Sequence, residues 1–163
     1  SLEREYRALM RAKFGLTRES GEDDELIRDF LGLLQGSHAD YTIMFRHLGT
    51  FSSQPGAKNE HLREFFLDRD RFDEWALRYR ERLHMERSHD DERRRAMDIV
   101  NPKYVLRNYL AQNAIEKAQQ KDFSEIDRLF ALLQRPCAEQ SGMDAYAAPP
   151  PNWGKHLSVS CSS

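Results

Sequence analysis

Two cysteines are the residues of this chain best suited to covalent chemistry. Cys161 is followed only by Ser162 and Ser163, and Cys137 lies well before it. A thiolate attacks disulfides and peroxides, and a cysteine beside a chain end can be approached from many directions. Such a position is poor for core packing and good for redox chemistry. Cys161 is therefore the candidate redox residue.

Histidines are the next candidates, because imidazole nitrogen is a common metal ligand. Structural zinc needs four nitrogen or sulfur ligands at short, recognisable spacings, and neither the histidines nor the two cysteines form such a cluster. We therefore expect no metal site in this chain and interpret the histidines as surface or packing residues. They are His38, His47, His61, His84, His89 and His156.

Nucleotide chemistry would need a Gly-rich loop over the phosphates, a lysine that reaches them and acidic or amide ligands for magnesium. The eight glycines are scattered and match neither G-x-G-x-x-G nor G-x-x-x-x-G-K-[ST]. Gly154 and Lys155 lie in a proline-bounded tail with no helix expected after them. The sequence thus predicts no catalytic and no cofactor-binding residues in this chain.

Arginine-rich stretches raise the question of nucleic-acid binding, which requires an uncompensated basic face. Acidic residues are interleaved with these arginines, and the formal net charge is −2. We therefore expect ion pairs on solvated helix faces and no nucleic-acid partner. The arginines concerned are Arg78, Arg80, Arg82, Arg87, Arg93, Arg94 and Arg95.

Composition sets the class of protein. With 163 residues, 39% hydrophobic and 32% charged, the chain is typical of globular proteins that bury a sizeable core. No apolar run approaches the roughly 20 residues of a membrane span, and no signal-peptide pattern precedes the first helix. Two cysteines are too few for a disulfide-rich secreted scaffold. These features predict a cytoplasmic protein without a membrane partner.

Hydrophobic residues recur with a period near 3.6 along most of the chain, and strand signals are lacking. The sequence predicts an all-α fold, an irregular assembly of about seven or eight helices with an extended Pro-rich C-terminal arm. The expected division is a helical domain over 1–135 and a tail over 136–163. The most regular pattern is formed by Phe72, Trp75, Ala76, Tyr79 and Leu83.

Helix boundaries follow from capping residues. The first helix begins at once after Ser1, with no expected cap, and a later one follows the carboxylates of residues 22–25. Asp40 is expected to cap a short helix, with a loop over 49–59 after it. Ser88 and Ser124 are expected to open helices through capping boxes, and the last helix should bury residues 126, 129, 130 and 133.

A helix is also expected from Lys103 to Gln120, capped by Asn101 with Pro102 at its first position. Arg107, Asn108 and Asn113 are its notable polar residues. A buried Asn or Arg must find partners, so we favour a structural clamp over contact with a ligand.

The proline run 149–151 should be held in polyproline II, a stiff conformation. A spacer that reaches back over the chain's own surface is favoured over a ligand for an aromatic groove in a partner. Trp153 would then anchor the tail and fix the place of Cys161.

Three segments together carry a resemblance to a known family. They are residues 39–46 (ADYTIMFR), residues 101–108 (NPKYVLRN) and the tail from 147 to 163. The chain resembles the C-terminal region of the selenoprotein O family from about Lys13 onward, as a Cys-containing bacterial member. In that family the third residue from the end is selenocysteine or cysteine, and here it is Cys161.

The resemblance implies a larger enzyme. Full-length members are protein adenylyltransferases on a protein-kinase-like (pseudokinase) fold, which use ATP and Mg²⁺ or Mn²⁺ to move AMP onto Ser, Thr or Tyr hydroxyls of proteins. This chain would be the part that lacks the catalytic site, and the N-terminal kinase-like region in cis would be its partner. The immediate start of the first helix agrees with a cut inside a longer protein.

Selenocysteine in relatives further implies redox work at Cys161, through a reversible disulfide. Its partner would be Cys137 or a cysteine of the missing region, and we favour the missing region because Cys137 is not among the residues that carry the resemblance. The alternative function is an autonomous helical protein-interaction module. A severed piece should expose a large apolar patch and could form a non-native dimer, whereas a free-standing module should not.

Overall fold

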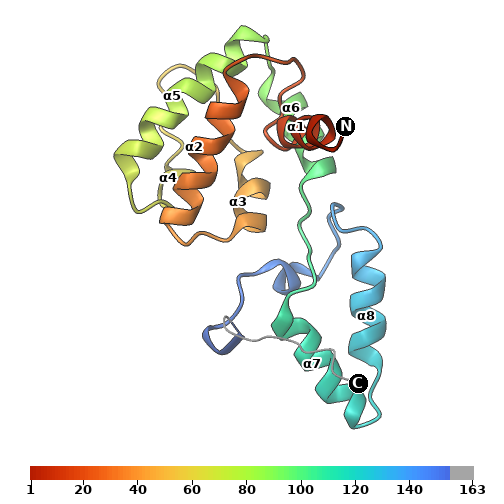
Figure 1. The fold of residues 1–163 in the computed structure, drawn as a ribbon. Coiled ribbons are helices and arrows are strands. Elements are labelled where there is room, and N and C mark those ends of the chain that lie inside the picture. Colours follow the sequence, from red (N-terminus) through yellow and green to blue (C-terminus); the bar gives the residue numbers. More distant parts are fainter. Residues whose placement is uncertain (155–163) are drawn as a thin grey trace. The chain divides into compact units, whose positions relative to one another are not determined.

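The structure is a computed structural model that describes residues 1–154. Within these residues it is all-helical, as the sequence predicts, with eight α-helices, two 3₁₀ turns and no strand. The elements are α1 (Leu2–Lys13), α2 (Asp23–Gly36), α3 (Tyr41–Leu48), α4 (Glu60–Arg63), α5 (Arg69–Met85), α6 (Asp90–Val100), α7 (Asn108–Gln119), α8 (Ser124–Leu133), η1 (Asp144–Ala147) and η2 (Asn152–Gly154) (Figure 1).

The chain forms two compact units, which we call the N-terminal unit (residues 1–101) and the C-terminal unit (residues 102 onward). The contacts therefore divide the chain between Asn101 and Pro102. The expected division into 1–135 and 136–163 is drawn from composition instead, and it stays a prediction.

An aromatic cluster fills the core of the N-terminal unit, where α2 packs on α5. Phe14 meets Phe30 edge to face at 5.3 Å between ring centroids, and Trp75 stacks on Tyr79 at 4.8 Å. Trp75 Nε1 donates to the carbonyl of Leu26 at 2.9 Å, which satisfies its only donor in the core. All the residues of the regular pattern on α5 are buried, as predicted.

Short polar contacts fix the loops of this unit. Asp40 accepts from the amide of Ile43 at 2.9 Å, so the predicted cap of α3 is confirmed. The predicted loop after α3 is closed by Asn59, whose amide group accepts from the Ser52 N–H at 2.7 Å and donates to the Ser52 carbonyl at 3.1 Å. Asn59 has a φ of 49°, a conformation that asparagine tolerates well.

The C-terminal end of α1 is fixed by close packing on α6. Gly15 has a φ of 68°, and a Cβ there would lie 2.5 Å from Cγ of Arg93 and 2.8 Å from the sulfur of Met97. Asn101 donates from Nδ2 to the carbonyl of Lys13 at 3.0 Å. Because only glycine fits this approach, the turn after α1 is held tightly against α6.

The first helix begins directly after Ser1, as expected, but three capping expectations in the N-terminal unit and at its end are wrong. The hydroxyl of Ser1 accepts from the Arg4 amide at 3.3 Å, so α1 has a cap where none was expected. His89, and not Ser88, precedes α6. Asn101 ends α6 in an extended conformation, and its side chain donates to the carbonyl of Lys13. It therefore caps no following helix.

The C-terminal unit is a pair of helices, α7 and α8, with a small core of Tyr109, Leu110, Ala114 and Leu129. The helix expected from residue 103 begins only at Asn108. Residues 102–107 are non-helical because the amides of Lys103 and Tyr104 both donate to the carbonyl of Pro136, at 2.9 and 3.1 Å.

Two details of α8 also differ from expectation. Asp122, and not Asp127, is the capping carboxylate: its Oδ1 accepts from the amide and the hydroxyl of Ser124 at 3.0 and 2.6 Å. Ile126 and Phe130 are exposed, whereas Leu129 and Leu132 are buried. The helix is therefore rotated relative to the expected inward face, and one apolar stripe faces solvent.

Candidate functional site

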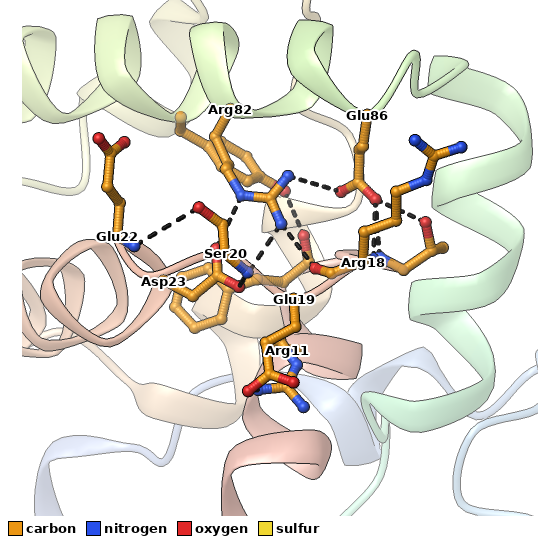
Figure 2. Close-up of polar contacts among 11 residues, drawn as sticks. Arg11, Arg18, Glu19, Ser20, Glu22, Asp23, Arg82 and Glu86 are labelled. Carbon is orange, nitrogen blue, oxygen red and sulfur yellow. Dashed lines mark hydrogen bonds and ion pairs between the residues drawn. The ribbon is translucent and has the colours of Figure 1, made fainter.

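A buried ionic cluster lies in the N-terminal unit, between α5 and α2. Arg82 on α5 donates from Nε to Asp23 of α2 at 2.7 Å, and one terminal nitrogen lies 3.5 Å from Glu86. All three side chains are almost wholly buried. Figure 2 shows the guanidinium lying between the two carboxylates.

Each carboxylate also binds the backbone of the α1–α2 loop. Asp23 accepts from the amide of Ser20 at 2.8 Å. Glu86 accepts from the amide and hydroxyl of Thr17, at 2.8 and 2.5 Å, and from the Arg18 amide at 3.2 Å. The loop thus obtains partners that no secondary structure supplies, as buried polar backbone requires.

The sequence explains why these groups meet. Asp23 lies in the first turn of α2, where the helix dipole favours a carboxylate. Arg82 and Glu86 are four residues apart at the end of α5, so they share one face. Arg82 also donates to the carbonyl of Arg18 at 2.6 Å. One arginine therefore joins two helices and the loop between α1 and α2.

This cluster can hold structure but offers little reactive capacity. Its guanidinium is a permanent cation, and Asp23 and the Oε2 atom of Glu86 accept several hydrogen bonds from fixed donors. The other Glu86 oxygen, Oε1, makes no hydrogen bond but is buried, 3.5 Å from Arg82. A general base or nucleophile needs a free, substrate-facing atom. The geometry therefore defines a clamp for the loop of residues 15–22.

A second ionic cluster joins α6 to the loop after α3. Asp90 accepts from the amide and hydroxyl of Ser53, at 3.0 and 2.6 Å, and from Arg93 at 2.8 Å. Partial burial would raise the pKa of Asp90, but the Ser53 hydrogen bonds and the Arg93 charge outweigh it and lower the pKa. Arg93 also donates to the carbonyl of Phe51 at 2.6 Å. Asp90 is thus held ionised as a structural acceptor.

Most of the arginines considered for nucleic-acid binding make contacts within the protein. Arg78 pairs with Asp29 at 2.7 Å, and Arg82 and Arg93 are buried in the two clusters above. Arg80 donates to the carbonyl of Ala57 at 2.5 Å. The expected ion pairs are therefore present, although two of the arginines are interior and not on a solvated face.

The three polar residues predicted on the helix after Pro102 lie at its N-terminus and in its middle. Arg107 is the half-buried N-cap residue of α7, and Asn108 is exposed in its first turn. Asn113 lies half-buried in the middle of the helix. They take part in the local structure of α7, and a clamp remains the interpretation for them.

A surface ion cluster in the C-terminal unit has no counterpart in the sequence predictions. The Lys103 ammonium donates to Glu139 at 2.6 Å and to Asp144 at 2.9 Å. These hydrogen bonds, with Glu139 the larger influence, raise the pKa of Lys103. We call this set the lysine clasp. The sequence did not predict the lysine clasp, because Lys103 was expected to be helical and its two partners are more than thirty residues away along the chain.

Gly154 lies in the η2 turn, and its position is explained by packing. A Cβ there would lie 2.7 Å from Cβ of Tyr109, so glycine permits the tail to approach α7 closely. That role differs from a phosphate-binding glycine. Lys155 and the redox candidate Cys161 lie outside the described residues, as does the side chain of Trp153. Cys137 is half-buried.

Magnesium and zinc need convergent ligands, and the described residues contain no group of three or more His, Cys, Asp or Glu side chains that could hold an ion. No helix in the same part of the chain has both the length and the apolar character to cross a membrane.

Comparison with known proteins supplies the class. The family model described as "Protein adenylyltransferase SelO" matches residues 1–134. This is most of the chain, and the chain therefore belongs to the SelO family, as the resemblance indicated.

Particular relatives share about half of the sequence. The chain is 54% identical over 158 residues to "Protein nucleotidyltransferase YdiU" of Herminiimonas arsenicoxydans, which covers 97% of this chain and 32% of the relative. It is 51% identical to proteins of the same name from Burkholderia pseudomallei K96243 and Myxococcus xanthus DK1622, over 94% of this chain and 30% and 32% of those proteins. The chain thus spans about a third of the length of these relatives.

Proposed function

We propose that this chain is the helical C-terminal part of a SelO-type protein adenylyltransferase whose catalytic residues lie outside it. The observation that carries the proposal is the family match over residues 1–134, combined with relatives about half identical and roughly three times as long. The described ionic clusters support it, since their carboxylates serve loops and helix ends.

The complete protein would bind ATP with Mg²⁺ or Mn²⁺ and transfer AMP to a Ser, Thr or Tyr hydroxyl of a substrate protein. The hydroxyl oxygen forms a bond to the α-phosphorus, the bond to the β-phosphate oxygen breaks and pyrophosphate leaves, while the hydroxyl proton passes to a base. All these reacting groups would lie in the region outside this chain. Two cysteines and no disulfide framework favour a cytoplasmic setting.

An AMP-transfer assay with ATP labelled on the α-phosphate tests this proposal. The full-length protein should label substrate proteins in the presence of Mg²⁺ or Mn²⁺, and the 163-residue chain should not. Calorimetric titration of the chain with ATP and Mg²⁺ should show no heat of binding.

Binding by the chain alone would contradict the proposal. Gly154→Ala, Lys155→Ala and Arg107→Ala would then locate the overlooked site. A chain that binds a protein partner tightly, with no transfer by the full-length protein, would favour the autonomous helical interaction module instead.

We further propose that Cys161 regulates the enzyme by forming a reversible disulfide, with a cysteine of the region outside this chain preferred over Cys137. An oxidant such as a peroxide or another disulfide would take up the two electrons and two protons that the thiols release. Mass mapping of the mildly oxidised full-length protein should find Cys161 in a disulfide. Cys161→Ser should abolish it and Cys137→Ser should not. Cys161 recovered only as a free thiol would contradict the proposal.

A further inference from the structure

Helix α1 exposes an apolar stripe that its own unit does not cover. Leu2, Tyr6 and Leu9 follow each other at intervals of four and three residues, and they are 84%, 56% and 53% exposed. This spacing places them along one face of the helix. Only Met10 of the twelve residues of α1 is buried.

A groove between α1 and α2 continues this face. It has a volume of about 400 Å³, and its apolar lining comes from Tyr6 and Met10 of α1 and from Ile27 and Leu31 of α2. Tyr6 therefore belongs to both the stripe and the groove. We call the two together the α1–α2 face.

Tyr41 at the start of α3 is another partly exposed aromatic residue of the N-terminal unit. Its ring packs on Phe45 with centroids 4.6 Å apart, and it is nearly half exposed. Burial, with a smaller influence from the neighbouring phenol of Tyr6, raises the pKa of Tyr41. Tyr6 and Tyr41 are both partly exposed aromatic residues, a type enriched where proteins bind each other.

Charged groups surround the groove. Arg7 pairs with Glu3 at 3.0 Å and with Asp24 at 3.4 Å, and all three line it. Arg28 lies on the same rim. An apolar centre with a polar rim is the anatomy of a protein interface.

The energetics of α1 call for an additional contact. A helix of about twelve residues is marginal in water unless an apolar face is packed. Here the apolar stripe faces solvent, while the rest of α1 is held by buried Met10, by the Lys13 ammonium over the ring of Phe45, by the Arg7–Asp24 pair and by the turn at Gly15. A partner on the α1–α2 face would bury the stripe and stabilise the helix.

We propose that the α1–α2 face is the surface on which the remainder of the same polypeptide packs. The inference rests on the proposed function, since it requires this chain to be part of a longer protein. About two thirds of each relative's length lies outside the match. A segment of the same polypeptide reaches effective concentrations on the order of millimolar, far above those of a second copy in a cell.

Thiol labelling of single-cysteine variants tests this location. Cys137 and Cys161 are replaced by serine, and Tyr6→Cys or Leu9→Cys is added in both the 163-residue chain and the full-length protein. Glu74→Cys, on an exposed position of α5, is the control. Labelling at positions 6 and 9 should be roughly 100-fold slower in the full-length protein, because it requires opening of the contact, whereas position 74 should change little.

A second pair of variants guards against misfolded cysteine variants. Leu9→Glu should lower the melting temperature of the full-length protein by several degrees and leave that of the 163-residue chain nearly unchanged. Leu77→Glu, which is equally exposed on α5, should affect neither.

The inference would be overturned if positions 6 and 9 were labelled equally fast in the two proteins. It would also be overturned if position 74 were protected in the full-length protein as strongly as positions 6 and 9. Protection in the 163-residue chain alone that increases with its concentration would assign the face to a second copy. Labelling needs no turnover, so a protected face in a protein that transfers no AMP would support this inference and contradict only the proposed activity.

Discussion

The N-terminal and C-terminal units are both helical, but different interactions hold them together. The N-terminal unit has an aromatic core and two ionic clusters with buried arginines. The described part of the C-terminal unit has a smaller core, centred on a cluster of four residues, and the lysine clasp ties its non-helical segments on the surface. Burial therefore dominates in the first unit, while the second relies on contacts that water and salt can weaken.

The largest effect is expected from the aromatic core. Trp75→Ala removes a ring stacked on Tyr79 and packed against Phe30, and should lower the free energy of unfolding of the N-terminal unit by about 3–5 kcal/mol. Leu77→Ala on the exposed side of α5 is the control and should cost less than about 0.5 kcal/mol. Urea unfolding followed by circular dichroism measures both. Similar losses would mean that the core is not what holds this unit.

The buried ionic cluster should give the next largest effect. Arg82→Met leaves Asp23 and Glu86 buried without their cation, which should cost about 3 kcal/mol. Arg78→Met, which removes an exposed pair with Asp29, should cost less than about 1 kcal/mol.

Urea unfolding also measures this pair, and adding Asp23→Leu to Arg82→Met should recover part of the loss. If Arg82→Met were as mild as Arg78→Met, the cluster would not clamp the loop.

A smaller effect is expected at the lysine clasp. Lys103→Ala should destabilise the C-terminal unit by about 1 kcal/mol, because both of its partners are exposed. The loss should shrink in 1 M salt, unlike that of Arg82→Met. Hydrogen exchange of the amides of Lys103 and Tyr104, which bind Pro136, reports it locally. An effect of Lys103→Ala that is insensitive to salt would remove the contrast between the units.

The smallest effect concerns pH. Burial lowers the pKa of His47, and the neighbouring His61 lowers it further. At pH values between the lowered pKa of folded His47 and about 6.5, the unfolded chain binds more protons than the folded chain. The contribution of neutral His47 to the free energy of unfolding is therefore present above about pH 6.5 and is lost as the pH falls through the folded pKa. His47→Gln should therefore flatten the melting temperature between pH 7 and pH 5, and His61→Gln should flatten it partly. An unchanged slope in both variants would contradict this assignment.

The sequence predicted the two units unequally well for the same physical reason. On α5 and α3 the helical period and the Asp40 cap are local signals, and both are confirmed. The predicted start of α7 was wrong. Pro102 has the local features of a first helical residue, but the two amides after it donate to the carbonyl of Pro136. Local rules do not register a partner so far along the chain.

The ionic clusters show the same limit. Arg82 and Asp23 are 59 positions apart, and Thr17 and Glu86 are 69 apart. Only the i, i+4 spacing of Arg82 and Glu86 could have been seen in advance. The role of Gly154 was likewise hidden, because its close approach to Tyr109 depends on where the tail passes.

The turn at Gly15 has a mechanical consequence for α1. Its C-terminal end is fixed by Met97 and Asn101, while the Leu2 end has little packing, so the helix is a cantilever about 18 Å long. Because of this length, a small rotation of α1 about its Gly15 end moves the Leu2 end by several ångströms. A contact that displaces the Leu2 end of α1 would therefore also shift the packing at Gly15 against α6. Helix α6 carries Asp90 and Arg93.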